Sequence, residues 1–292
     1  MKLILLFRTI EVSNTHTLRG ILLSILSFIF LLAGGFVAGT FGALLGLGGG
    51  VLLIPFLVMV LNVPMHQAIA TSIIAVIATS SAGAAMNLER RIVHMRLGML
   101  LEIATVSGAI LGGITANYLS ATALAKLFSG LMFLVAIIMI WRIRQHSGQE
   151  KFYTDGVLPG NYIDDANGTT IYYTVKKVPA VMMISLIAGN VSGLLGVGGG
   201  IFKVPAMNIL SGVPMKAATA TSNFMIGVTA AASAFIYFAH GHLNPFIAST
   251  AALGVLVGSM TGVRISRKIH SKVLTWVFAI ALLVISVQLY LR

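Results

Sequence analysis

Residues 189–222 read GNVSGLLGVGGGIFKVPAMNILSGVPMKAATATS, and this stretch decides the fold because residues 39–72 carry an earlier version of it. The earlier version reads GTFGALLGLGGGVLLIPFLVMVLNVPMHQAIATS. It aligns without a gap at a distance of 150 residues, with 15 of the 34 positions identical. A duplication of helix-breaking residues in apolar surroundings is typical of membrane proteins in which two discontinuous helices form a solute site.

The two copies share residues that a duplicated apolar core would not need to keep. A run of three glycines makes a poor helix interior, so we interpret each run as a break in a helix. The prolines that follow, Pro55 and Pro205, are candidate structural hinges. The shared residues are Gly46, Gly48, Gly49, Gly50, Pro55, Pro64, Thr71 and Ser72 in the first copy, and Gly196, Gly198, Gly199, Gly200, Pro205, Pro214, Thr221 and Ser222 in the second.

Composition places the chain in a lipid bilayer. Only 9% of the residues are charged and 58% are hydrophobic, and the mean hydropathy is +0.98. The net charge of +12 would favour nucleic acid as the partner of a soluble protein. Nearly all Lys and Arg residues lie in short gaps between apolar runs, however, so we expect no nucleic-acid binding. Cysteine is absent, which excludes disulfides and thiolate metal sites.

The apolar runs predict an all-α polytopic membrane protein built from two repeats. Residues 1–19 form a basic N-terminal segment that we expect in the cytoplasm. Residues 20–141 form the first repeat, and its extra N-terminal helix lies near 20–38. A re-entrant element then turns at the glycines and leaves through the next apolar run, and three spans follow. The re-entrant element turns at 46–50 and leaves through 51–61, and the spans lie near 66–87, 96–118 and 122–141.

The second repeat occupies residues 178–292 and follows a polar segment. Residues 142–177 predict a linker or a small cytoplasmic subdomain, with a short hairpin around 165–168 that feeds the strand-like run TTIYYTV. The repeat itself begins with a re-entrant element at 178–211. That element turns at 196–200, and spans near 215–238, 244–264 and 272–291 follow.

The distribution of basic residues predicts the orientation of the spans. The gaps after 87 and after 263 are rich in arginine and lysine and are expected in the cytoplasm. The gaps at 118–122 and 239–243 contain neither residue and are expected outside. This assignment uses seven full spans and makes the two repeats inverted. In the alternative, residues 51–61 and 201–211 cross the membrane fully, and the basic gaps then move to the outside. The basic residues are Arg90, Arg91 and Arg96 in one gap and Arg264, Arg267, Lys268 and Lys272 in the other.

Each break offers chemistry suited to a negatively charged solute. A helix that restarts after a glycine run presents free backbone N–H groups and the positive end of its dipole. Two inverted copies would bring two such ends together near the middle of the bilayer. Hydroxyl groups recur on the next helix of each copy and could bind an oxyanion. Close helix packing by the glycines, with hydroxyls bonded to helix carbonyls, is the structural alternative. The hydroxyl and amide residues are Thr71, Ser72, Thr221, Ser222 and Asn223.

Two ionisable residues lie in apolar context. Lys203 follows the second glycine run and has Leu53 as its counterpart, so we expect it to attract the anion, with a snorkelling lysine as the alternative. Glu102 lies inside its span and is a candidate coupling carboxylate, with a pairing to Arg96 as the alternative.

The histidines do not predict a metal site. They fall in loops or at helix ends without a metal-ligand spacing on a common face, and we expect them to be surface or gate residues. We therefore expect no metal and no cofactor. The histidines concerned are His66, His94, His240 and His242.

The paired LLGxGGG motifs, each followed by a proline, VPM and AIATS or ATATS, resemble the sulfite exporter TauE/SafE family. The likeness covers about residues 28–292. It implies an inner-membrane carrier for sulfur-containing anions such as sulfite or sulfonates, usually an exporter driven by an ion gradient. The glycines, prolines and Thr-Ser pairs match the family motif, whereas Lys203 and Glu102 are not carried over from it.

These observations lead to one hypothesis and its alternatives. We expect a secondary transporter, not an enzyme, that binds a small oxyanion between the two breaks and exchanges access between the two sides of the cell inner membrane. A proton or sodium ion could be the coupling ion. A cation or metal efflux carrier would need acidic residues in the spans, and a non-transporting scaffold would not need the glycine breaks twice. The sequence does not predict an oligomeric state.

Overall fold

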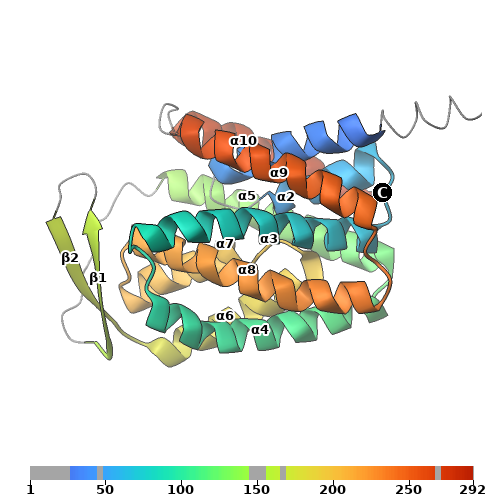
Figure 1. Ribbon diagram of the computed structural model, residues 1–292. Coiled ribbons are helices and arrows are strands. Elements are labelled where there is room, and N and C mark those ends of the chain that lie inside the picture. Colours follow the sequence, from blue (N-terminus) through green and yellow to red (C-terminus); the bar gives the residue numbers. More distant parts are fainter. Residues whose placement is uncertain (1–26, 45–48, 145–155, 165–168, 267–270, 292) are drawn as a thin grey trace, which may run out of the picture.

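Seven helices in the computed structural model are long and apolar enough to cross a membrane. The structure describes residues 27–44, 49–144, 156–164, 169–266 and 271–291, and Figure 1 shows the helices as one bundle. An eighth long helix, α10 (Ser271–Leu291), packs against α5. The seven spanning helices are Ser27–Leu44, α3 (Met65–Glu89), α4 (Met95–Tyr118), α5 (Ala121–Arg144), α6 (Val178–Leu195), α8 (Met215–Ala239) and α9 (Pro245–Ser266).

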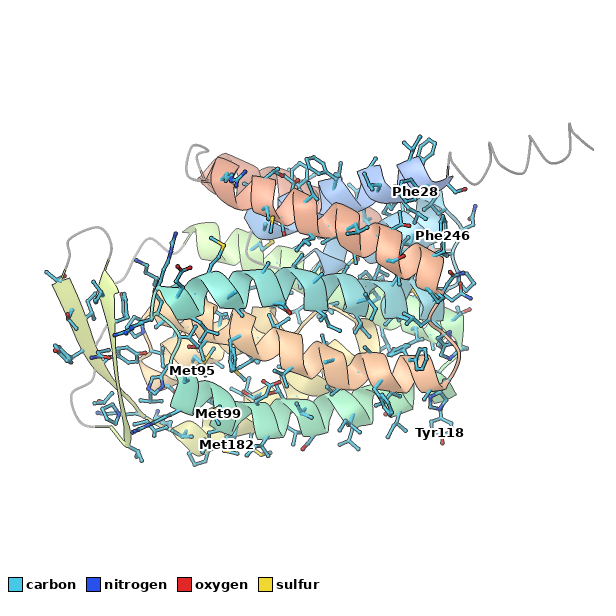
Figure 2. All side chains as sticks on the ribbon, viewed as in Figure 1. Phe28, Met95, Met99, Tyr118, Met182 and Phe246 are labelled. Carbon is cyan, nitrogen blue, oxygen red and sulfur yellow. The ribbon has the colours of Figure 1, made fainter. Side chains whose placement is uncertain are left out.

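Apolar side chains cover the outside of this bundle. Met99 on α4, labelled in Figure 2, is 61% exposed, and Met183 on α6 is 64% exposed. A contiguous apolar surface of this kind is stable against lipid and unfavourable in water. The chain is therefore a multi-pass membrane protein, as predicted from its composition.

Two short helices interrupt the pattern of long ones, one in each repeat. Helix α2 (Gly50–Pro55) continues as a π-helical turn over Phe56–Val60, and α7 (Gly200–Pro205) continues likewise over Ala206–Leu210. The prolines lie at the junctions, where their missing N–H groups are tolerated by the wider turn. The predicted break in each repeat is therefore confirmed as a short helix that begins at the last glycine of the run.

The repeat distance of 150 residues holds throughout the central elements. Helices α2 and α7 begin at Gly50 and Gly200, and α3 and α8 begin at Met65 and Met215. The helix Ser27–Leu44 corresponds to α6, α4 to α9, and α5 to α10. The duplication seen in the sequence is thus a duplication of structure.

The beginning of the second repeat differs from the expected single re-entrant element. Residues 178–211 form the full-length helix α6 and the separate helix α7, with the expected turn between them at 196–200. Helix α6 has 18 residues and a mean hydropathy of 1.8, which is enough to cross a bilayer. The sequence does not mark the end of α6, because no charged residue occurs between its start and Lys203.

Contacts between helix ends define two ends of the bundle. His66, near the start of α3, bonds to the carbonyl of Ala116 near the end of α4 and stacks on His242 after α8. We call this the histidine end, and Phe28 also lies there, against Phe246 (Figure 2). The other end carries the arginines of the turn before α4 and the β-hairpin, and we call it the hairpin end.

In each repeat, the stretch of chain that contains the short helix runs from one end of the bundle to the other, so the short helices are not re-entrant. Thr40 bonds to Gly258 and Ala43 lines a cavity with Arg264, both towards the hairpin end of α9, whereas His66 lies at the histidine end. The chain therefore crosses the bundle between Ala43 and His66. In the second copy, the hydroxyl of Tyr237 donates a hydrogen bond to the carbonyl of Leu194 at the histidine end. The backbone N–H of Lys176, just before α6, donates to the carbonyl of Ser211 at the hairpin end.

A small antiparallel hairpin lies within the polar segment between the repeats. Strand β1 (Leu158–Asp164) pairs with β2 (Thr169–Val175), and Tyr173 of β2 packs against His94 at the start of α4. The predicted hairpin is present, although its turn at 165–168 lies outside the described residues. The expected cytoplasmic segment 1–19 also lies outside them and stays a prediction, and the first described helix begins at the histidine end, opposite the basic turns.

Glycines let two pairs of helices pack backbone to backbone. A methyl group at Gly108 of α4 would overlap the carbonyl of Leu186 in α6, and one at Gly258 of α9 would overlap the carbonyl of Phe36. These contacts correspond at a distance of 150 residues: Gly108 to Gly258, and Phe36 to Leu186. Helix α6 thus packs on α4 as the helix Ser27–Leu44 packs on α9.

Candidate functional site

The two breaks meet where α3 and α8 pack together at the centre of the bundle. Ser72 of α3 donates a hydrogen bond of 2.8 Å to the carbonyl of Gly196, across the repeat boundary. Gly50 lies in the same place, since a Cβ there would be 2.5 Å from Ser72 Oγ and 2.8 Å from the carbonyl oxygen of Gly196. The start of the first short helix is therefore held against the end of α6.

The second break needs glycine for its backbone conformation. Gly196, Gly198 and Gly199 have φ angles of +69°, +84° and +65°, a region that costs other residues roughly 1–2 kcal/mol. Gly200 then begins α7 against Ile226 and Ser222 of α8. Of the first run, Gly46 and Gly48 lie outside the described residues.

The predicted hydroxyl residues surround the breaks and are buried. Thr71 and Ser222 have buried hydroxyl oxygens without a hydrogen-bond partner in the described part of the chain. Thr221 accepts a hydrogen bond of 2.9 Å from the backbone N–H of His94. Ser72 and Thr221 thus tie α3 and α8 to neighbouring segments, and none of the four hydroxyl residues lines the cavity described next.

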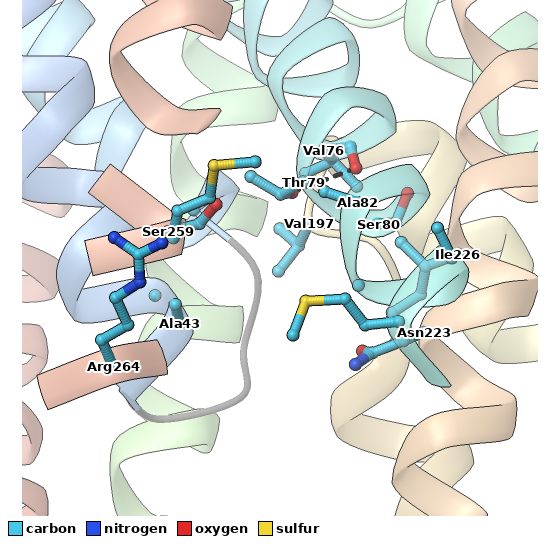
Figure 3. Close-up of a pocket in the computed structure, with 16 residues that line it drawn as sticks. Ala43, Val76, Thr79, Ser80, Ala82, Val197, Asn223, Ile226, Ser259 and Arg264 are labelled. Atoms are coloured by element: carbon cyan, nitrogen blue, oxygen red, sulfur yellow. Dashed lines mark hydrogen bonds between the residues drawn. The ribbon is translucent and has the colours of Figure 1, made fainter. Parts of the chain in front are cut away.

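A cavity of about 680 Å³ extends from the breaks towards the hairpin end (Figure 3). Gly49 of the first break and Val197 of the second both line it, so it reaches the two discontinuities together. Asn223, the predicted amide, also lines it. The remaining lining residues are Gly42, Ala43, Val76, Thr79, Ser80, Ala82, Gly83, Ala85, Met86, Ile226, Ser259, Met260 and Arg264.

The polar side chains that line the cavity are hydroxyls, an amide and a guanidinium. Among the described residues, no carboxylate lines it. Arg264 is exposed at the hairpin end of the cavity, and Figure 3 shows its guanidinium beside Ser259. Thr79 and Ser80 now donate to carbonyls of their own helix, at 3.1 Å each. The amide of Asn223 adds N–H donors. A cavity that carries one cation, hydroxyls and an amide favours an anion.

Sequence reasoning missed most of these lining residues. Thr79 and Ser80 lie on the face of α3 that begins at Ser72 and continues through Val76, so the spacing of seven residues from Ser72 to Thr79 was a usable signal. No spacing in the sequence relates Ser259 and Arg264 to the glycine breaks. They reach the cavity because α9 packs beside α3, which the sequence does not reveal.

Lys203 lies apart from this cavity. Its side chain is 0% exposed, and its ammonium has no hydrogen-bond partner among the described residues. Glu102 of α4 is the charged group that interacts with it. Glu102 itself is 8% exposed and accepts hydrogen bonds from Thr105 at 3.1 Å and from Thr229 at 2.7 Å. The two ionisable residues singled out in the sequence are thus both buried and interact electrostatically, without a hydrogen bond between them.

The histidines divide between the two ends of the bundle. At the histidine end, the rings of His66 and His242 stack at 4.8 Å, and His240 stacks on His242 at 6.5 Å. Partial burial, with His66 and His240 nearby, lowers the pKa of His242. At the hairpin end, burial lowers the pKa of His94. The described residues contain no group of three His, Asp or Glu side chains that could hold a metal ion.

Comparisons with known proteins agree with this architecture. The model of the family "Sulfite exporter TauE/SafE" matches residues 31–289. The probable membrane transporter protein YunE of Bacillus subtilis is 27% identical over 90% of this chain and 97% of its own length. Similar proteins described in the same words occur in Xylella fastidiosa, at 26% identity over 92% and 96%, and in Methanocaldococcus jannaschii, at 24% over 82% and 86%. No solved structure matches the chain significantly.

Proposed function

Because the chain belongs to the sulfite exporter TauE/SafE family, we propose that it is a secondary transporter of small sulfur-containing oxyanions, such as sulfite or organosulfonates, and that it exports them across the inner membrane. The observation that carries the proposal is the cavity that reaches both glycine breaks and opens beside Arg264. Its relatives are described as probable membrane transporters, which agrees with a protein that is not an enzyme.

The cavity wall supports an anion as the solute. Arg264 supplies a fixed positive charge at the mouth, and Asn223 supplies an amide donor further in. The hydroxyls of Thr79 and Ser80 would donate to the anion by turning away from the carbonyls of their own helix. Gly49 and Val197 bring the two breaks to the inner limit, where the first-turn N–H groups of a helix lack partners within it. No Asp or Glu lines the cavity within the described residues, which disfavours the alternative of cation efflux.

Contacts at the two ends of the bundle support inverted repeats and alternating access. The helix Ser27–Leu44 and α3 begin at the histidine end, whereas their counterparts α6 and α8 begin at the hairpin end. The cavity is open towards the hairpin end, where the positive-inside rule places the cytoplasm. Rocking the two copies would close it there and open its counterpart at the histidine end.

Flux measurements in proteoliposomes test this function. Wild-type protein is expected to exchange labelled sulfite or an alkanesulfonate and to discriminate against chloride. Replacing Arg264 or Asn223 (Arg264→Gln, Asn223→Leu) should weaken the apparent affinity about 10- to 150-fold, since a hydrogen bond to a charged group contributes about 1.5–3 kcal/mol.

The matched control is Arg96→Gln, because Arg96 is exposed and does not line the cavity. It should exchange the anion as the wild type does. Equal losses in Arg96→Gln and Arg264→Gln would show that general surface charge, not the cavity, attracts the anion. Absence of exchange for all the sulfur oxyanions would refute the proposal.

A further inference from the structure

The buried pair of Glu102 and Lys203 is not used by the cavity that we assign to the anion. Lys203 lies on α7 and Glu102 on α4, and neither lines the cavity. The pair occurs in one copy of the repeat only, since the counterparts of Lys203 and Glu102 are Leu53 and Ala252. The fold therefore does not need charges at these positions in order to form.

The ammonium of Lys203 is poorly compensated for a structural ion pair. It has no exposed surface and no hydrogen-bond partner in the described part of the chain, although a buried ion pair is favourable only when its remaining donors are satisfied. Among the described residues, Glu102 is the titratable group that interacts with it. A pair of this kind is costly to keep and is therefore a candidate for function.

The carboxylate is held by two threonine hydroxyls that each have a second acceptor. Thr229 points its single hydroxyl hydrogen at Glu102 Oε1, 2.7 Å away, while the carbonyl of Met225 lies at 3.0 Å. Thr105 lies 3.1 Å from Glu102 Oε2 and 2.8 Å from the carbonyl of Leu101. A hydroxyl has only one hydrogen to donate, so each threonine must choose between the carboxylate and its own helix.

This choice depends on the charge of Glu102. A carboxylate attracts a hydroxyl more strongly than a neutral acid does, because charge-assisted hydrogen bonds are stronger. Binding of one proton converts the carboxylate to the acid and changes the net charge of the pair from zero to plus one. Thr229 and Thr105 then favour the helix carbonyls, and the link between α4 and α8 through Thr229 weakens.

Helix α8 connects this pair to the anion cavity. Thr229 faces Glu102, while Asn223 and Ile226 of the same helix line the cavity. The counterpart of Thr229 in the first repeat is Thr79, which lines the cavity open in this structure. If the copies exchange roles, Thr229 lines the cavity that opens at the histidine end, and Glu102 behind it becomes accessible from that side.

We propose that Glu102, with Lys203 as its counter-cation, is the proton-coupling site of this transporter: it binds one proton per transport cycle and is separated from the anion site by α8. This inference rests on the proposed function. The oxygen atoms around Glu102 could also suit a sodium ion, but the ammonium of Lys203 already supplies the positive charge that such a site would bind.

The test uses the full chain in proteoliposomes with labelled sulfite and a pH-sensitive dye inside the vesicles. In wild-type vesicles whose membrane potential is clamped at zero, a pH difference of about one unit should sustain about tenfold accumulation when one proton is exchanged per anion, because one pH unit is a tenfold proton ratio. Glu102→Gln should retain anion exchange without a gradient, lose accumulation driven by the pH difference, and give no dye response when anion is added.

The control is Glu89→Gln, which removes an exposed carboxylate at the end of α3 and should behave as the wild type. Thr229→Val should shift the pH at which driven transport is half-maximal, and Thr229→Ser, which keeps the hydroxyl, should restore it. These two variants keep the inference testable if Glu102→Gln does not fold.

Each result discriminates between the two proposals. Exchange in the wild type, with pH-driven accumulation preserved in Glu102→Gln, would overturn the coupling site and leave the transport function intact. Accumulation by the wild type that is driven by a sodium gradient and not by a pH gradient would also overturn the coupling site and leave the transport function intact. Loss of all anion exchange in the wild type would instead refute the transport function itself.

Discussion

The hydrogen bond of Ser72 joins the two repeats at the two helix breaks. Ser72 Oγ donates to the carbonyl of Gly196, and both groups are buried. Gly196 ends α6 in a left-handed conformation, so the position of its carbonyl determines where the second break begins. We infer that Ser72 positions the break and is not a ligand of the anion.

Replacing this serine tests that role. Ser72→Ala should lower the free energy of unfolding by about 1–3 kcal/mol, because the carbonyl of Gly196 is left without its partner in a buried place. Ser107→Ala is the control, since the hydroxyl of Ser107 is exposed and bonds within its own helix. Thermal unfolding of both variants in detergent makes the measurement, and equal shifts would contradict the assignment.

His94 should make stability depend on pH. Its Nδ1 accepts a hydrogen bond from the backbone N–H of Leu97 at 3.3 Å, which requires that nitrogen to be unprotonated. Burial lowers the pKa of His94 in the folded protein below its ordinary value of 6.5. The unfolded chain therefore binds this proton first, so the stabilisation is complete above pH 6.5 and is lost as the pH falls through the folded-state pKa.

The measurement compares wild type with His94→Asn, because asparagine caps a helix without titrating in this range. The melting temperature of the wild type should fall relative to that of the variant as the pH is lowered below 6.5. Parallel pH profiles for the two proteins would show that His94 does not contribute.

At the scale of elements, glycine-lined pairs of helices hold each repeat to the other. Helix α4 packs on α6 through Gly108, and α9 packs on the helix Ser27–Leu44 through Gly258. Each pair joins a helix of one repeat to a helix of the other. These pairs are therefore candidates for the rigid parts of the molecule, between which the breaks move.

A matched pair of substitutions tests the packing. Gly108→Ala should destabilise the protein by about 1–3 kcal/mol, because the new methyl group overlaps a backbone carbonyl that cannot rotate away. Gly130→Ala on α5 should be neutral or stabilise by up to about 1 kcal/mol, because nothing lies within 4 Å and alanine favours the helix. Similar losses in both would exclude close packing as the reason for the first.

The elements were predictable from the sequence to different extents. The two short helices followed from the duplicated glycines, because glycine runs inside apolar segments leave few alternatives. Helix α6 was merged with the break after it, since residues 178–195 end without a charged residue. The contributions of Ser259 and Arg264 to the cavity depend on how α9 packs beside α3, which is a tertiary contact that no local pattern encodes.

At the scale of the whole molecule, the two ends of the bundle differ in chemistry. The hairpin end carries Arg90, Arg91 and Arg96 and an open cavity, while the histidine end carries stacked histidine rings and the buried Tyr237. We interpret this as the state open to the cytoplasm. The side chains at the counterpart positions then define the wall of the opposite cavity.

One measurement tests this central claim most directly. The chain has no cysteine, so single cysteines at positions 79 and 229 can be labelled with a membrane-impermeant reagent in intact cells and in inverted vesicles. The account predicts that position 79 reacts only from the cytoplasmic side and position 229 only from the outside, with anion exchange making both accessible in turn. Reaction of both positions from the same side, or of position 229 from neither side during exchange, would contradict it.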